Sequence, residues 1–357
     1  MKYLIVSSLL MAALGCSESK FTPGDGSRSF DKTPKTAPPT QSPGSGDGVG
    51  MTPGDEEPRP IEFDSEFDTF LRSCIAEEMT ANYNGPVIPL KLTQTLDDFG
   101  SSALQNYEEF ETLADLILRQ IIDAEGLIDY EILRNDLSAQ WQVLVDAMTN
   151  SNFVLPPLGT EEKAAMAFWT NIYNLAMIDI LVKAPQAENV LSDIGLELFD
   201  VKRDLAGTSI SLNEIEKGVM SLAGSPKDVP ANIKIPTVEP RLHYTVVCGA
   251  VSCPRIRNFL YRPEMFPKVL IENELSVINS TKHFWMEDGE FLIHNQLFSF
   301  YPNDFALLYG NKFINLPEKL IPNCRDDIAL IETAVNRANP SDYIYDELYD
   351  WTVNSQN

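Results

Sequence analysis

Basic residues are scarce in this chain. Lys and Arg together number 27 against 52 Asp and Glu, which gives a formal net charge of −25 at pH 7. This excess of negative charge repels nucleic-acid phosphates and anionic lipid head groups. The chain also lacks a glycine-rich phosphate loop and a dinucleotide-binding fingerprint. We therefore expect neither a nucleic-acid partner nor a bound cofactor.

Histidine and cysteine are also rare, with three and five residues respectively. His243, Cys248 and Cys253 nevertheless fall together within the fourteen residues 241–254, which read R-L-H-Y-T-V-V-C-G-A-V-S-C-P. Residues 241–248 are β-branched and aromatic, with Pro before them and Gly after them, which predicts a buried strand that ends in a tight loop. We expect any chemistry to take place at this strand and loop.

The two cysteines of this stretch allow different interpretations. Cys253 precedes Pro254, so it could be the N-cap of a helix, where the helix dipole and nearby Arg255 and Arg257 would lower the pKa of its thiol. A structural disulfide between Cys248 and Cys253 is the competing interpretation. A zinc site with His243 would need a further ligand that the sequence does not offer, so we expect no metal.

The first sixteen residues predict a secretion signal, because a short basic start is followed by an apolar run too short to span a bilayer. The L-G-C ending at Cys16 resembles a bacterial lipobox, which would make Cys16 the lipidated first residue of the mature protein. An ordinary signal peptide with an incidental Cys is the alternative. We expect a protein of the bacterial cell envelope, held by lipid on the outer membrane or the periplasmic face.

The remaining chain divides into two parts. Residues 17–60 are rich in Pro, Gly, Ser and Thr and are expected to form a disordered tether. Residues 61–357 have the size of a single globular domain. Within that domain Cys74 could pair with Cys324, but other pairings of its four cysteines stay open.

The first half of the domain is predicted to be helical. Apolar residues recur at helical spacing in Phe67–Met79, Asn106–Asp123 and Tyr130–Thr149. A longer helix is predicted from an N-cap at Thr160 to about Lys183. It is apolar nearly all round, which is typical of a helix at the centre of a fold.

Two amides of this central helix, Asn171 and Asn174, share one face. A buried amide must be hydrogen-bonded, because leaving one unpaired costs about 1–3 kcal/mol. They could bond the backbone of a neighbouring loop, or they could line a cleft and orient a catalytic group.

The second half mixes strands and helices. Ser209–Met220 predicts a short strand that enters a Ser-capped helix, and Asp288-Gly289 predicts a hairpin turn between Phe284–Met286 and Phe291–Ile293. Helices are predicted over Phe266–Ile278 and Ile328–Asn336. The predicted class is α+β, mainly helical, with one buried central helix and a small antiparallel sheet that carries the loop.

Several motifs resemble the family called domain of unknown function 547. They are E-E-K-A-A-M-A-F-W-T-N-I-Y-N, G-L-I-D-Y, I-S-L-N-E-I-E-K-G-V-M, the stretch at 241–254 and L-F-S-F-Y-P-N-D-F. The resemblance extends over about residues 110–305. It implies a fold and a region of interest around His243, Cys248-Gly249 and Ser252-Cys253-Pro254, but no reaction.

Three functions compete. The order of a buried helix, then His243, then Asp304 is similar to that of cysteine peptidases and transglutaminases, which favours a thiol hydrolase or transferase. Its nucleophile would be Cys253 or Cys248, Asn171 would orient the catalytic group, and binding or positioning roles would fall to Tyr173, Asn174, Arg241 and Ser252. The alternatives are a non-catalytic envelope lipoprotein that binds or scaffolds a partner, and a thiol-disulfide redox protein that uses Cys248 and Cys253.

Overall fold

A computed structural model describes residues 94–99, 103–123, 125–149, 161–220, 222, 227–266 and 268–356. The predicted signal, Cys16, the tether, the helix at Phe67–Met79, Cys74 and Thr160 lie outside these residues.

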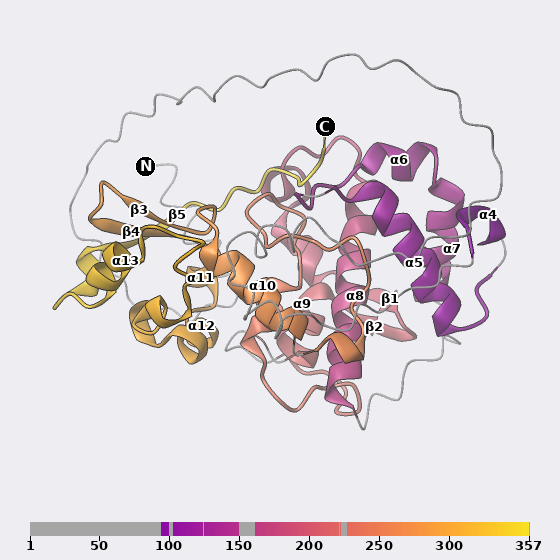
Figure 1. The fold of residues 1–357 in the computed structure, drawn as a ribbon. Coiled ribbons are helices and arrows are strands. Elements are labelled where there is room, and N and C mark those ends of the chain that lie inside the picture. Colours follow the sequence, from indigo (N-terminus) through magenta and orange to yellow (C-terminus); the bar gives the residue numbers. More distant parts are fainter. Residues whose placement is uncertain are drawn as a thin grey trace, which may run out of the picture.

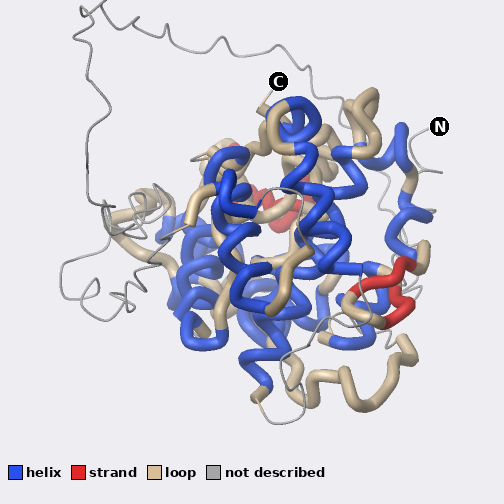
Figure 2. The backbone as a smooth tube through the Cα atoms, turned by 90° about the vertical axis from the view of Figure 1, so that its right-hand side faces the viewer, coloured by secondary structure: helices blue, strands red, loops and turns tan. Residues whose placement is uncertain are grey.

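The described chain is mainly helical with two small sheets, as Figure 2 shows in blue and red. This agrees with the predicted α+β class. The α-helices are α4 Leu96–Phe99, α5 Tyr107–Ile121, α6 Tyr130–Asn135, α7 Ser138–Thr149, α8 Glu162–Val182, α9 Leu212–Glu214, α10 Lys268–Asn279, α11 Leu297–Phe300, α12 Pro302–Tyr309 and α13 Ile328–Val335. The strands are β1 Arg203–Leu205, β2 Thr208–Ile210, β3 Phe284–Glu287, β4 Phe291–Asn295 and β5 Ile344–Glu347.

Eight short helical segments connect these elements. Two are π-helical, η1 Val190–Ile194 and η3 Ile215–Val219. The others are 3₁₀ turns: η2 Leu196–Asp200, η4 Pro240–Tyr244, η5 Pro263–Met265, η6 Asn311–Phe313, η7 Pro317–Lys319 and η8 Pro340–Asp342.

Helix α8 is the buried central helix that the sequence predicts. It is long and apolar enough to cross a membrane, but most of it is buried inside the fold, and nearly every side chain from Ala164 to Ile178 is inaccessible to solvent. In Figure 1 it stands beside α5–α7, while β3–β5 and α13 lie on the opposite side of the molecule. We expect α8 to stabilise the fold mainly through the burial of apolar side chains on all of its faces.

The two amides of α8 bond the backbone of neighbouring loops, which is one of the two alternatives predicted for them. Asn171 Nδ2 donates to the Tyr261 carbonyl at 2.8 Å, and its Oδ1 accepts from the Tyr261 N–H at 2.8 Å. Asn174 makes the same pair of contacts with the Thr245 carbonyl and the Val247 N–H. Both loops are therefore held on α8 by two hydrogen bonds each.

Two local predictions are wrong. Residues 241–248 do not form a strand, because Pro240 begins the 3₁₀ turn η4 and the Glu239 side chain caps it by accepting from the Arg241 N–H. This local cap outweighs the β propensity of the residues that follow. Tyr130–Thr149 is two helices rather than one, with a break at residues 136–137.

The larger sheet also differs from the prediction. The hairpin of β3 and β4 turns at Asp288 and Gly289, both with positive φ, as predicted. However, β4 also pairs in parallel with β5, so the sheet is mixed, and it does not carry the loop after Gly249.

A C-terminal segment, residues 349–356, makes most of the contacts that hold that loop, and Asn295 at the end of β4 adds one hydrogen bond to the Ser252 carbonyl. In Figure 1 this segment runs from β5 back toward the N-terminal helices. It bridges Ile128, Asn189 and Ala250. The Ser252 N–H donates to the Asp350 carbonyl, and the Asp350 N–H donates to Ser252 Oγ. The end of the chain thus fixes a loop about one hundred residues earlier in sequence.

The contacts of Asn174 predict a large effect on stability. Asn174→Ala leaves a buried carbonyl and a buried N–H without partners, which should lower the free energy of unfolding by about 2–3 kcal/mol. Urea denaturation measures this change. Asn232→Ala, at an exposed position, is the control and should change stability by less than about 0.5 kcal/mol. Equal effects of the two substitutions would contradict the role given to Asn174.

Candidate functional site

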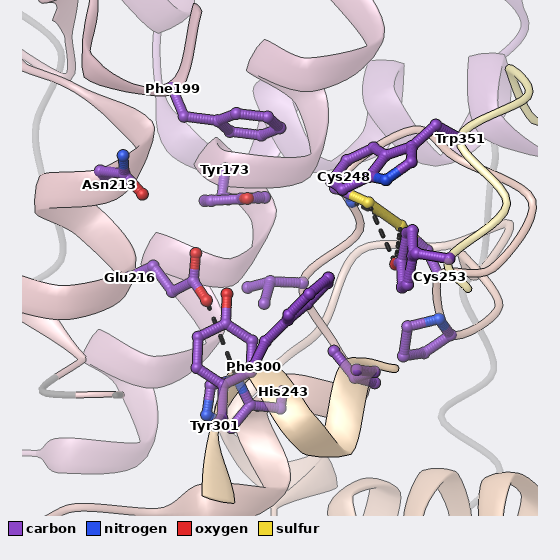
Figure 3. Close-up of a pocket in the computed structure, with 14 residues that line it drawn as sticks. Tyr173, Phe199, Asn213, Glu216, His243, Cys248, Cys253, Phe300, Tyr301 and Trp351 are labelled. Atoms are coloured by element: carbon purple, nitrogen blue, oxygen red, sulfur yellow. Dashed lines mark hydrogen bonds and ion pairs between the residues drawn. A yellow bond between two sulfur atoms is a disulfide. The ribbon is translucent and has the colours of Figure 1, made fainter. Parts of the chain in front are cut away.

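A small cavity lies between α8, η3, η4 and the C-terminal segment (Figure 3). It has a volume of about 50 Å³, enough for a few water molecules or a small chemical group. Its lining combines aromatic and polar side chains: Tyr173, Phe199, Asn213, Glu216, His243, Val246, Cys248, Cys253, Pro254, Leu297, Phe300, Tyr301, Tyr349 and Trp351.

His243 is held on three sides in this cavity. It is only 1% exposed, and its Nε2 lies 2.8 Å from Asp304 Oδ2. The Tyr301 ring stacks on the imidazole with 4.1 Å between ring centroids. Because a carboxylate accepts hydrogen bonds, the neutral imidazole carries its hydrogen on Nε2 and leaves a lone pair on Nδ1.

Nδ1 of His243 has no hydrogen-bond partner among the described residues, although it is buried. Glu216 Oε1 lies 3.8 Å from this nitrogen. Both atoms accept hydrogen bonds while the imidazole is neutral and the carboxylate ionised, so they do not satisfy one another. A water molecule or substrate hydroxyl beside them could donate to either.

Three buried tyrosines surround Glu216. Burial first, and then the negative charge of Glu216, raise the pKa of Tyr173, Tyr301 and Tyr349 above its usual value. Figure 3 shows the Tyr301 ring and the Glu216 carboxylate side by side, and the Tyr173 hydroxyl has no hydrogen bond with any other described residue. These phenols therefore stay protonated at ordinary pH, and Tyr173 can donate to a molecule in the cavity.

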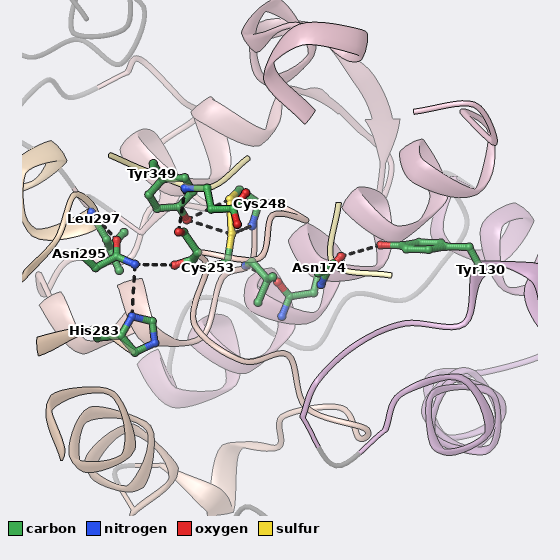
Figure 4. Close-up of a disulfide and its surroundings, with 12 residues drawn as sticks. Tyr130, Asn174, Cys248, Cys253, His283, Asn295, Leu297 and Tyr349 are labelled. Carbon is green, nitrogen blue, oxygen red and sulfur yellow. Dashed lines mark hydrogen bonds between the residues drawn. A yellow bond between two sulfur atoms is a disulfide. The ribbon is translucent and has the colours of Figure 1, made fainter. Parts of the chain in front are cut away.

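The two cysteines of the cavity are joined in a disulfide (Figure 4). The Tyr349 hydroxyl lies 3.1 Å from Cys253 Sγ and 3.3 Å from Cys248 Sγ. Neither sulfur is a thiol, so neither can act as nucleophile or zinc ligand in this state. Cys324 is also disulfide-bonded, and its predicted partner, Cys74, lies outside the described residues.

The predicted site residues separate into two groups. His243, Tyr173, Cys248 and Cys253 line the cavity, with Asp304 directly behind the imidazole. Asn171, Asn174, Arg241 and Ser252 do not line it: the amides hold loops, Arg241 pairs with Glu239, and Ser252 bonds the C-terminal segment.

The prediction that Cys253 caps a helix is wrong. Residues 254–262 form no helix, and Cys253 Sγ accepts from the Cys248 N–H at 3.0 Å. The disulfide fixes Cys253 in a turn instead, so the argument for a thiol activated by a helix dipole does not apply.

Sequence reasoning missed Glu216, Tyr301, Tyr349 and Trp351. Glu216 is only 5% exposed and lies in the π-helix η3, a kind of distortion that is frequent at functional sites. The surrounding sequence, L-N-E-I-E-K-G-V-M, contains two glutamates and a lysine, so no local signal distinguishes Glu216. Tyr349 and Trp351 come from the distant C-terminal segment, which no local pattern connects to the cavity.

In the described part of the chain, no three His, Cys, Asp or Glu side chains lie close enough together to bind a metal ion. The site is therefore best described by its imidazole, carboxylates and phenols.

Comparison with known families gives one match. Residues 157–275 match the family described as protein of unknown function, DUF547. The DUF547 match contains α8, Glu216, His243 and both cysteines of the disulfide, whereas Asp304, Tyr301 and Tyr349 lie beyond it. No curated protein and no solved structure matches the chain.

The disulfide predicts the outcome of thiol labelling. Without a reductant, iodoacetamide should leave Cys248 and Cys253 unmodified at any pH, because neither sulfur is free. After treatment with a dithiol, both should be alkylated, as mass spectrometry of tryptic peptides would show. Labelling of Cys253 in the untreated, folded protein would contradict the disulfide.

Proposed function

We propose that this protein is a hydrolase or group transferase that acts on an acyl group, with His243 as general base. Asp304 orients the imidazole and fixes its tautomer, and Tyr173 donates a hydrogen bond to the substrate. We further propose that the protein is a lipoprotein of the bacterial cell envelope, anchored through Cys16.

One observation carries the proposal: the lone pair of His243 Nδ1 is buried, faces Glu216 at 3.8 Å and has no donor among the described residues. A buried acceptor without a partner is costly, by about 1–3 kcal/mol, so its retention at a cavity favours a functional role. The opposite nitrogen is fixed by a carboxylate, which is the usual arrangement for a histidine general base.

The proposed reaction uses water or an acceptor hydroxyl as nucleophile. His243 Nδ1 takes its proton while the oxygen bonds to the carbonyl carbon of an ester or amide. The imidazolium that forms lies between Asp304 and Glu216, whose negative charges stabilise it. The carbon–leaving-group bond then breaks, and the imidazolium returns the proton to the leaving group.

A thiol-dependent form of this reaction applies only to the reduced protein. The order of α8, His243 and Asp304 is similar to that of cysteine peptidases and transglutaminases. A thiolate at Cys253 or Cys248 requires the disulfide to open first, with a dithiol as the electron donor.

The closed disulfide favours a second function, that of a non-catalytic envelope protein that binds or scaffolds a partner. In that case the disulfide and the His243–Asp304 pair only hold the loop in shape. The two functions differ in whether substitution of His243 removes an activity or only lowers stability.

Activity assays on the full chain with p-nitrophenyl esters, aminoacyl p-nitroanilides and acyl thioesters test the proposal. His243→Gln should lower the rate by at least about 100-fold, because a general base contributes about 10²–10⁴-fold. Asp304→Asn should also lower it, because a neutral amide stabilises the imidazolium less than the carboxylate does and can turn its NH₂ group toward Nε2, which favours the other tautomer. The double variant Cys248→Ser/Cys253→Ser should keep the rate measured without reductant.

His294→Gln is the matched control, because His294 is buried but belongs to β4 and does not line the cavity. It should change stability without removing activity. Turnover only after reduction, and its loss in the double cysteine variant, would favour the thiol-dependent form. No turnover of any substrate with or without reductant would overturn the enzymatic proposal in favour of binding.

A further inference from the structure

A second, larger cavity lies on the other side of Pro254. Its volume is about 190 Å³. Pro254 lines both cavities, and the consecutive residues His243 and Tyr244 face the first and the second respectively. The second cavity is lined by Glu125, Tyr244, Pro254, Arg255, Asn273, Ser276, Val277, Ser280, Lys282 and His283.

Two cationic side chains, Arg255 and Lys282, line this cavity although the whole chain has a net charge of −25. Partial desolvation by the cavity walls, and then the positive charge of Arg255, lower the pKa of Lys282, while Asp350 acts in the opposite direction. The carboxylate in the lining is Glu125, and both Glu125 and Lys282 are exposed at the cavity mouth.

Neutral donors complete the lining. The Asn295 amide nitrogen lies 3.4 Å from His283 Nδ1, and because the amide nitrogen can only donate, Nδ1 accepts and the ring hydrogen is on Nε2. Burial lowers the pKa of His283 to about 3, so this imidazole is neutral at ordinary pH. Figure 4 shows its other nitrogen pointing away from Asn295. The hydroxyls of Ser276 and Ser280 can also donate.

The chain makes specific room for Arg255. Gly126 has a φ of +80°, and a Cβ at this position would overlap the Arg255 side chain. Gly126 thus lets the aliphatic part of Arg255 pass close to the backbone on its way to the cavity. Two features therefore favour glycine at position 126: the close approach of the Arg255 side chain and the positive φ of the backbone.

We propose that this second cavity binds an oxyanion, a carboxylate or phosphate group of a small ligand. Arg255 offers a planar guanidinium fork and Lys282 a point charge, and His283 and the serines offer neutral hydrogen bonds. The acyl chemistry proposed for the first cavity is not needed for this site, because the two cavities use different polar side chains.

Isothermal titration of the full chain with inorganic phosphate and with acetate, at an ionic strength held constant with NaCl, tests the proposal. We expect saturable binding of at least one anion. Lys282→Ala should weaken it at least tenfold. Lys234→Ala removes the same charge at an exposed position outside the cavity and should leave the affinity within twofold.

Arg255→Gln is a second variant and should also weaken binding at least tenfold, with its fold checked by circular dichroism. Binding of phosphate alone would assign a phosphoryl group, and binding of acetate would assign a carboxylate. Equal weakening by Lys234→Ala and Lys282→Ala, or no saturable binding of either anion, would overturn the site. His243→Gln should bind the anion normally, so failure of the proposed catalysis and failure of this site are distinguishable.

Discussion

The pairing of two buried amides with loop backbone is the interaction on which the site depends. Asn171 and Asn174 lie on one face of α8, and each satisfies both a carbonyl and an N–H of a separate loop. Because Thr245 and Val247 follow η4 directly, the second pair of bonds also fixes the position of His243. A buried helix without these amides could pack equally well, but the loops would lose four hydrogen bonds that water cannot replace.

His243 is stabilised by groups that differ on each side of its ring. Asp304 binds Nε2, Tyr301 covers one face of the imidazole, and Glu216 lies near Nδ1 without a hydrogen bond to it. A purely structural histidine would be expected to use both nitrogens, since burial makes an unpaired acceptor costly. The asymmetry between the two nitrogens is therefore what distinguishes this site from a core network, and it arises because η3 brings Glu216 close but not into contact.

The sequence predicts those parts of the fold that local chemistry determines. Helix α5 begins at the cap residue Asn106, and the capping box of Ser211 and Glu214 starts α9, because each cap bonds within its own turn. The contact of Asp304 with His243 was predictable only by likeness to enzymes with the same order of elements. The parallel pairing of β5 and the position of Tyr349 were not predictable, because both depend on contacts distant in sequence. The 3₁₀ turn η4 shows the reverse case, where a cap by Glu239 outweighed a strand-like composition.

The segment Cys253-Pro254-Arg255 lies between the two cavities and is fixed at several points. Cys253 is tied to Cys248 by the disulfide, Ser252 just before it bonds the C-terminal segment, and Arg255 passes close to Gly126. A segment held at these points resists displacement from either side, because moving it would break backbone hydrogen bonds as well as side-chain packing. A reacting group beside His243 and an anion beside Arg255 would therefore be recognised by separate contacts. Binding of one would change the affinity for the other only slightly.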